Sequence, residues 1–233
     1  RDVINLEKMH TTKAKYLVDL VNAPVDALTQ PASQLRIYHI NEAIHLSDVL
    51  PILENLGLRV LQQENDVVRA DDRPKCGIDV FRVVDKREGS QLDVRQSREK
   101  LAGALVELLE GQAENDRLNG LLLSTNLNLR QINLLRSFQT HYHQINPAST
   151  RTFLNDVLLE NPKSAQLLYN VFEARFKPEF DGREATVESL KNQFMESLNA
   201  VTSLAYDRTL RELLNLVESV LRTNFFLGKP YIS

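Results

Sequence analysis

Residues suited to chemistry are few in this sequence of 233 residues, and its only cysteine is Cys76. Cys76 opens a predicted strand and has no histidine neighbour in the sequence. A nucleophilic thiol needs a base or a positive charge beside it, so we interpret Cys76 as a small buried or inert side chain. A lone cysteine also excludes an internal disulfide framework and fits a reducing cytoplasm.

Two histidines near the end of a predicted helix, His141 and His143, have some likeness to a metal motif. They are two residues apart, which places them on different faces of a helix, whereas helical metal ligands are normally three or four apart. We therefore expect solvated histidines, mildly favoured by the negative end of the helix, and no metal site.

A small polar group surrounds the turn that is predicted between the first well-defined strand and helix. His39 and His45 flank this turn, and Asn41 and Glu42 lie within it. Two interpretations are open: the four side chains form a small site for an effector, or the turn is an ordinary one with polar surface residues. The candidate effector residues are His39, Asn41, Glu42 and His45.

Carboxylates and amides also gather in the leucine-rich half of the chain, at Glu114, Asn115, Asp116 and Asn119. Paired carboxylates can act as acid and base, but only in a cleft that shifts their pKa values. The alternative is structural, with a carboxylate paired to an arginine of a neighbouring helix and fixing the register of the bundle. The candidate arginines are Arg130, Arg136 and Arg175. A second set of polar locks is predicted beside the last apolar stripe, at Asp207, Arg208, Arg211, Arg222 and Asn224.

Several classes of function lack their sequence signals. The eight glycines are scattered, so no glycine-rich loop is present to hold a nucleotide or dinucleotide cofactor. The net charge of −3 gives no general footprint for nucleic acid, although residues 118–139 have the rough shape of a helix-turn-helix. No apolar run is long enough to cross a bilayer. We expect no cofactor, metal, nucleic-acid or membrane partner for this stretch of chain.

The elements that must position these residues begin with a dense block at 35–63, which reads as strand, helix and strand. Ser47 is predicted to cap the helix over 47–56, and Pro51 is placed in its first turn, where a missing N–H costs least. Gly57 is predicted to end the helix in the left-handed conformation. Further strands are expected around a turn at 64–66 and a second turn at 71–75. The strand candidates are 16–21, 35–40, 58–63, 67–70 and 78–84.

After about Gln91 the apolar spacing changes to three and four, which predicts helices. Helix breaks are expected at Gly111, at Asn126 and at the Asn146–Pro147 pair, and helix caps at Asn128 and at Asn161, which precedes Pro162. An apolar stripe over 210–221 closes the series. The fold class is therefore α+β, with a small sheet in a domain at 1–90 and an all-α bundle at 91–233.

Six blocks of this sequence resemble a known family in their order along the chain. They are LSDVLPILENLGLRV (46–60), AENDRLNGLLL (113–123), LLRSF (134–138), FEARF (172–176), DRTLRELLNLVESVLRTNFF (207–226) and KPYIS (229–233). Together they are similar to the large-type NAD-dependent bacterial glutamate dehydrogenases over nearly the whole chain.

The resemblance implies a segment of a longer enzyme, in line with a sequence that starts at Arg1 without Met. Residues 1–90 would be the last ACT-like, ferredoxin-like βαββ regulatory module, and 91–233 the helical region just before the catalytic domain of the same chain. The parent would be a cytoplasmic homo-oligomer that oxidises L-glutamate with NAD. None of the family's catalytic or NAD-binding residues has a counterpart here, so the segment alone is expected to be inactive.

Two features depart from the family pattern: the run IDVF at 78–81, where a His-Asp-Phe-like run is usual, and QTHYHQI at 139–145. A full ACT module also has a second helix and a final strand after its third strand. Either 16–21 supplies that missing strand or the sheet is incomplete. Two further roles stay open beside a supporting one: an amino-acid-sensing module, and a structural spacer whose exposed leucines, with Phe225 and Phe226, dock on a neighbouring domain or subunit.

Overall fold

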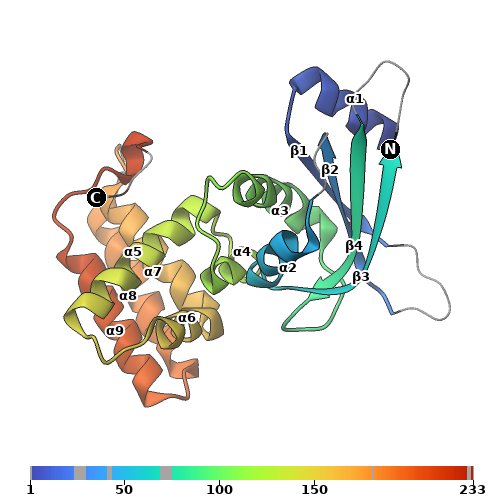
Figure 1. The fold of residues 1–233 in the computed structure, drawn as a ribbon. Helices are drawn as coiled ribbons and strands as arrows, with labels where there is room; N and C mark the ends of the chain where they lie inside the picture. Colours follow the sequence, from blue (N-terminus) through green and yellow to red (C-terminus); the bar gives the residue numbers. More distant parts are fainter. Residues whose placement is uncertain are drawn as a thin grey trace. The chain divides into compact units, whose positions relative to one another are not determined.

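The protein is represented by a computed structural model that describes residues 2–23, 30–40, 44–68, 75–179, 181–229 and 232. The chain forms two compact units, Arg1–Leu123 and Ser124–Ser233. The first contains the sheet and the second is helical, so the predicted α+β class, with an ACT-like sheet followed by helices, is confirmed (Figure 1).

The sheet of the first unit has four antiparallel strands in the order β1-β2-β4-β3. Helix α2 (Leu46–Asn55) connects β2 to β3, and β4 lies between these two strands. This split connection is typical of a ferredoxin-like module. The strands are β1 (Tyr16–Asn22), β2 (Ser33–Ile40), β3 (Leu58–Val68) and β4 (Cys76–Asp85).

Strand β1 settles whether the sheet is complete. It pairs antiparallel with β2, from Tyr16 opposite His39 to Asn22 opposite Ser33. Helix α3 (Val94–Leu109), which begins at the capping side chain of Asp93, packs against β1. Of the two alternatives that the sequence left open, the structure has the first: residues 16–21 join the sheet, and the final strand of the module comes from ahead of its first strand in the sequence.

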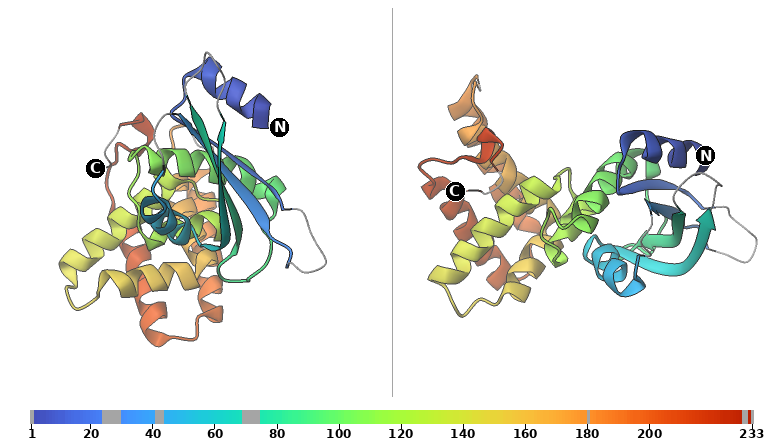
Figure 2. Two further views of the ribbon diagram at one scale, coloured as in Figure 1. Left: turned by 45° about the vertical axis from the view of Figure 1, so that its right-hand side comes forward. Right: turned by 45° about the horizontal axis from the view of Figure 1, so that its top comes forward.

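Helices cover both faces of this sheet. Leu35, Phe81 and their neighbours on one face are buried, and the elements packed on that side are α2 and α3. On the opposite face, Leu6 and Met9 of α1 (Asp2–Thr12) pack on a cluster that includes Tyr38 and Ile78. Figure 2 shows α1 and α2 on opposite sides of the strands. The first unit is thus built in three layers around a buried sheet.

The predicted turn at 64–66 is wrong, because β3 runs without interruption from Leu58 to Val68. Asn65 pairs with Asp79 of β4, and a bulge at Leu61 shifts the register. Polar residues suggested a turn here, but β3 is an edge strand that is exposed from Leu61 to Val68, so polarity and strand structure are compatible. Of the strand predicted at 67–70, the first two residues continue β3 and the others lie outside the described residues.

The start of α2 also differs from the prediction. The helix begins at Leu46 with His45 as its N-cap residue, and no side chain caps it. The amide of Asp48 bonds to the carbonyl of His45, so the first turn is formed before Ser47 can act as a cap. Pro51 consequently lies inside the helix, beyond the first turn in which it was predicted. Gly57 has φ 84° and ends the helix as predicted.

Between the two groups of helices, Gly111 has φ 69° and follows α3, as the predicted helix break requires. The polar stretch around Glu114 is not helical, and the apolar residues behind it form only a short 3₁₀ turn, η1 (Arg117–Gly120), and α4 (Leu121–Ser124). The compact units divide after Leu123. Our division at residue 90 rests on the change of sequence period and stays a proposal.

The second unit packs its helices around α7, which is buried over most of its length. Asn128 forms a complete capping box with Gln131 and confirms the predicted cap. Asn161 precedes Pro162 as predicted, but its side chain donates to the carbonyl of Val157 rather than capping the next helix. The helices are α5 (Leu129–Ile145), α6 (Arg151–Glu160), α7 (Pro162–Phe176), α8 (Arg183–Ser197) and α9 (Leu204–Ser219), with 3₁₀ turns η2 (Leu198–Ala200) and η3 (Phe225–Leu227).

The last apolar stripe ends earlier than predicted. Leu210, Leu213, Leu214 and Val217 are buried, but α9 ends at Ser219, and Leu221 is 95% exposed. The chain leaves the helix because Val220 is extended, with ψ 127°.

The segment after α9 then folds back onto its own unit. Phe225 is buried and packs edge-on against Phe172, and Phe226 stacks on the same ring. These two aromatic rings, predicted as docking residues for a neighbouring domain, therefore contact the helices of their own unit.

Candidate functional site

Asp79 of β4 is the most deeply buried carboxylate among the described residues, with 1% of its surface exposed. Its Oδ2 lies 3.1 Å from Nε2 of His39, and its Oδ1 accepts hydrogen bonds from Asn65 at 2.9 Å and from Gln63 at 3.2 Å. These partners come from β2 and β3, the two strands that flank β4. We call these four residues the Asp79 cluster.

Strand register explains why the cluster forms. Asn65 lies opposite Asp79, and His39 lies opposite Gly77, two residues from Asp79 on the same face. A Cβ atom at Gly77 would lie 2.2 Å from the imidazole of His39. Glycine at this position therefore makes room for the ring to lie across β4 and reach Asp79.

The hydrogen bonds keep the buried carboxylate ionised. Burial alone would raise the pKa of Asp79, but donation from His39 and Asn65 and the attraction of the imidazole hold that pKa below its ordinary value. Nδ1 of His39 is buried and has no hydrogen-bond partner in the part of the chain that the structure describes.

A cleft of about 570 Å³ lies at the same end of the first unit. Tyr16, which lines it, is the strand partner of His39. His45 and Asp48 supply polar groups from the start of α2. The remaining lining residues are Ile44, Ile52, Leu108, Leu109 and Gly111. The cleft is therefore mostly apolar with a few polar groups, as small-molecule sites commonly are.

The structure describes two residues of the predicted effector turn, His39 and His45, and separates them. His39 is buried in the Asp79 cluster, whereas His45 lines the cleft. Asn41 and Glu42 lie outside the described residues. The effector site stays a prediction, and its described part is His45 with the cleft.

Cys76 is buried, as interpreted from the sequence, but it has a histidine near it in space. Its Sγ lies 3.6 Å from Nε2 of His10, which α1 brings to the outer face of the sheet. Alternation along β4 places Cys76 and the Asp79 cluster on opposite faces. The thiol therefore cannot combine with His39 as a nucleophile and base.

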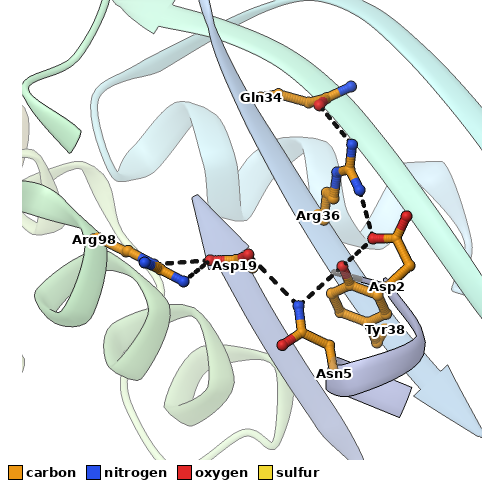
Figure 3. Close-up of polar contacts among 7 residues, drawn as sticks. All are labelled: Asp2, Asn5, Asp19, Gln34, Arg36, Tyr38 and Arg98. Carbon is orange, nitrogen blue, oxygen red and sulfur yellow. Dashed lines mark hydrogen bonds and ion pairs between the residues drawn. The ribbon is translucent and has the colours of Figure 1, made fainter. Parts of the chain in front are cut away.

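A second polar network fastens α1 to the outer face of the sheet (Figure 3). Asp2 accepts a hydrogen bond from Tyr38 at 2.7 Å and pairs with Arg36. Burial would raise the pKa of Asp2, but these two partners hold it below its ordinary value. Burial raises the pKa of Tyr38, and the neighbouring Asp2 carboxylate raises it further. The first turn of α1 is thus held by charge as well as by packing.

The same network continues to α3. Asn5 donates to Tyr38 at 3.1 Å and to Asp19 at 3.5 Å, and Arg98 of α3 donates to Asp19 at 2.8 Å. Asp19 is 3% exposed and lies on the edge strand β1. One buried carboxylate therefore links α1, β1 and α3, as Figure 3 shows.

The predicted polar locks of the first unit have local partners. Asp116 accepts from the amide of Leu118 at 2.9 Å, and Asn119 donates to the carbonyl of Glu114 at 2.9 Å. Asn115 accepts from Asn55 of α2 at 3.0 Å. This stretch consequently shapes the connection after α3 and attaches it to α2.

In the second unit, the predicted arginines bind backbone carbonyls. Arg130 donates to the carbonyls of Phe225 and Lys229, at 2.8 and 2.9 Å. Arg175 donates to those of Val217 and Val220. Both side chains therefore fasten the segment that follows α9 to the helices.

The remaining lock residues have contacts within one segment. Arg136 donates to Asn133 of the same helix. Asp207 pairs with Arg211 at 2.9 Å, and Arg208 pairs with Glu212 at 3.0 Å, both along α9. The carbonyl of Asn224 accepts from Leu227, and Arg222 is exposed.

The paired histidines of α5 have separate surroundings. Nδ1 of His143 lies 2.7 Å from the carbonyl oxygen of Ser149, and His141 is exposed. Across the described ranges, no group of three or more His, Cys, Asp or Glu side chains is arranged to hold a metal ion. Among the helices of those ranges, none has the length and apolarity needed to cross a membrane.

Comparison with known proteins identifies the family. Residues 21–97 match the family model for the glutamate dehydrogenase ACT3 domain, and residues 113–178 match that for glutamate dehydrogenase helical motif 3. An NAD-specific glutamate dehydrogenase of Pseudomonas aeruginosa is 36% identical over 216 residues, 89% of this chain. The chain belongs to the glutamate dehydrogenase family. In this chain the Asp79 cluster lies within the ACT3 match, and η1 to α7 lie within the helical-motif match.

Two further relatives are also NAD-specific glutamate dehydrogenases. The NAD-specific glutamate dehydrogenase of Halomonas elongata is 30% identical over 192 residues, and that of Mycobacterium tuberculosis is 26% identical over 206 residues. These matches cover 82% and 86% of this chain. The chain spans only 12–13% of the length of the relatives it matches.

The sequence contains one signal for the Asp79 cluster that the predictions above did not use. Asp79 is the single carboxylate in the apolar run Ile78–Val84, and a charged residue in a buried strand is normally paired. Its partners Gln63 and Asn65 were assigned to the end of a strand and to a turn, so no contact with Asp79 was expected.

Proposed function

We propose that this chain is a non-catalytic regulatory and structural segment of an NAD-dependent glutamate dehydrogenase. The parent enzyme would convert L-glutamate, NAD and water to 2-oxoglutarate, ammonium and NADH. The observation that carries the proposal is the succession of an ACT3 match and a helical-motif match in a chain that spans 13% of its Pseudomonas relative. The remainder of such a polypeptide has ample length for a catalytic domain.

The contacts and burial of the potentially reactive side chains support a non-catalytic role. Asp79 is occupied by three donors of its own sheet, and Cys76 lies buried on the opposite face. A catalytic acid or nucleophile must reach its substrate. NAD, the catalytic domain of the same chain and the other subunits of a homo-oligomer are proposed partners of the cytoplasmic parent.

Steady-state kinetics tests the proposal directly. The purified 233-residue chain and the full-length parent are assayed for NAD reduction with L-glutamate. We expect turnover by the parent and none by the chain, while circular dichroism shows that the chain is folded. Glutamate-dependent NAD reduction by the chain alone would overturn the proposal.

A second candidate function is amino-acid sensing, which the cleft beside α2 favours. His45 offers an imidazole and Asp48 a carboxylate next to apolar walls, and an amino acid presents a carboxylate and an ammonium group that could bind them. Allosteric control would further require that the ligand bind two states of the parent unequally.

Calorimetric titration of the chain with each common amino acid tests this second candidate. Binding heat that is lost in His45→Ala and retained in the control His141→Ala supports it, because His141 is exposed in the other unit. The absence of heat at millimolar ligand would count against a sensing role and would leave the supporting role as the function of the segment.

A third candidate role is that of a structural spacer. Exposed leucines supply its contact surface, since Leu204 is 89% and Leu227 69% exposed. Sedimentation of the chain separates this role from the others: self-association that Leu204→Lys abolishes supports it. A chain that stays monomeric at high concentration would contradict it.

A further inference from the structure

Strand β3 is an open edge of the sheet. It is the last strand in the order β1-β2-β4-β3, and it lies at the side of the sheet away from β1 in Figure 1. From Leu61 to Val68 its residues are exposed, and Val67 and Val68 expose 57% and 41% of their surfaces. In the part of the chain that the structure describes, no strand pairs with the outer side of β3. The amides and carbonyls on that side are therefore available to a strand of a partner.

The Asp79 cluster holds this edge in place. Gln63 and Asn65 of β3 both donate to the buried Asp79, and β3 pairs with β4 as far as Val68. An edge strand that merely frays at its end would not carry two side chains anchored to a buried carboxylate. The exposed stretch is thus fixed in an extended conformation, which reduces the entropy that a partner strand must remove on binding.

Between Leu61 and Val68 the charged side chains of this edge have one sign. Glu64 and Asp66 alternate with the anchored Gln63 and Asn65 and so project from the opposite face of the strand. Within the described ranges no cation forms an ion pair with either carboxylate, and Glu64 accepts only a neutral hydrogen bond, from Gln62. A strand that carries lysine or arginine at alternate positions would place cations beside both carboxylates.

We propose that residues 62–68 of β3 bind a basic extended segment as an added strand of the sheet. A second copy of this chain fits less well, because antiparallel pairing about Asn65 would set Glu64 of one copy opposite Asp66 of the other. Like charges directly opposite each other destabilise a strand pair. Main-chain hydrogen bonds would supply affinity, and the two carboxylates would select the basic partner.

Hydrogen exchange with defined peptides tests the proposal on the whole chain. The probes are a nine-residue peptide of alternating lysine and valine and its counterpart with glutamate in place of lysine. We expect the basic peptide to slow exchange of the amides of residues 62–68 and the acidic peptide to leave them unchanged. Failure of the basic peptide to protect these amides overturns the proposal.

Charge reversal identifies the carboxylates that select the partner. The double variant Glu64→Lys with Asp66→Lys should weaken binding of the basic peptide about tenfold. The matched control is Glu107→Lys with Glu110→Lys, two exposed carboxylates of the α3 end, with the same change of net charge. Equal weakening in the control would mean non-specific attraction and would overturn the proposal. Protection of residues 62–68 that rises with chain concentration without peptide would overturn it in favour of a second copy.

Discussion

The first unit buries a carboxylate inside its sheet, whereas the second unit uses half-buried arginines on backbone carbonyls. Asp79 joins β2, β4 and β3 through side chains, so removal of its charge leaves several donors without an acceptor. Arg130 and Arg175 bind a segment that aromatic rings also hold. The stability of the sheet should therefore depend on a titratable cluster, and that of the bundle on apolar packing.

The largest expected effect is in the second unit. Phe172→Ala removes the ring that contacts Phe138, Phe176, Phe225 and Phe226, and should lower the free energy of unfolding by about 4 kcal/mol. Denaturant unfolding followed by hydrogen exchange assigns the loss to one unit. Phe153→Ala, at a half-buried phenylalanine whose ring packs on Tyr206, is the matched control. A loss below 1 kcal/mol would break the view that this unit depends on packing.

Asp79→Ala should be nearly as damaging to the first unit, by about 3 kcal/mol, because His39, Asn65 and Gln63 lose their acceptor. Chemical denaturation measures the change, and Asp85→Ala, at the half-buried end of the same strand, is the control. If Asp79→Ala left the exchange of β3 amides unchanged, the cluster would not be what holds the edge strand.

Gly77→Ala should cost about 2 kcal/mol, because the new methyl group overlaps the imidazole of His39. A double-mutant cycle sharpens this prediction. In a His39→Ala background the same substitution should cost much less, since the ring is gone. Equal losses in both backgrounds would show that the glycine serves the strand and not the histidine.

Some of these features follow from the sequence alone, and others depend on tertiary contacts. Asn128 and Gly57 act through neighbours in the chain, so the start of α5 and the end of α2 were predicted correctly. The Asp79 cluster joins residues from three strands, and the network of Asp2, Tyr38 and Asp19 joins residues far apart in the sequence. Such contacts follow from register and helix packing, which a single sequence does not specify. Arg175 similarly binds the carbonyl of Val220 from another helix, at the point where α9 ends before its apolar stripe does.

The smallest expected effect is a change in the stability of the first unit at alkaline pH. Burial lowers the pKa of Lys100 from 10.5 to about 8, and its ammonium donates to the carbonyl of Leu122 at 2.6 Å. Between these values the unfolded chain binds more protons than the folded chain, so stability rises as pH increases through this window. The full shift corresponds to about 3 kcal/mol, which solvent screening of this half-buried group reduces to about 1 kcal/mol.

The free energy of unfolding is measured for the chain and for Lys100→Met at a series of pH values from 7.5 to about 10.5. The difference between the two isolates the contribution of the Lys100 ammonium. The stability difference between the two should shift in favour of the natural chain as pH rises, because only the natural chain loses an unfavourable buried charge. Lys163→Met, at the start of α7 in the second unit, should show no such shift. A pH-independent difference for Lys100→Met would mean that the ammonium is as well solvated in the folded chain as in the unfolded one, and would place the alkaline response of the first unit elsewhere.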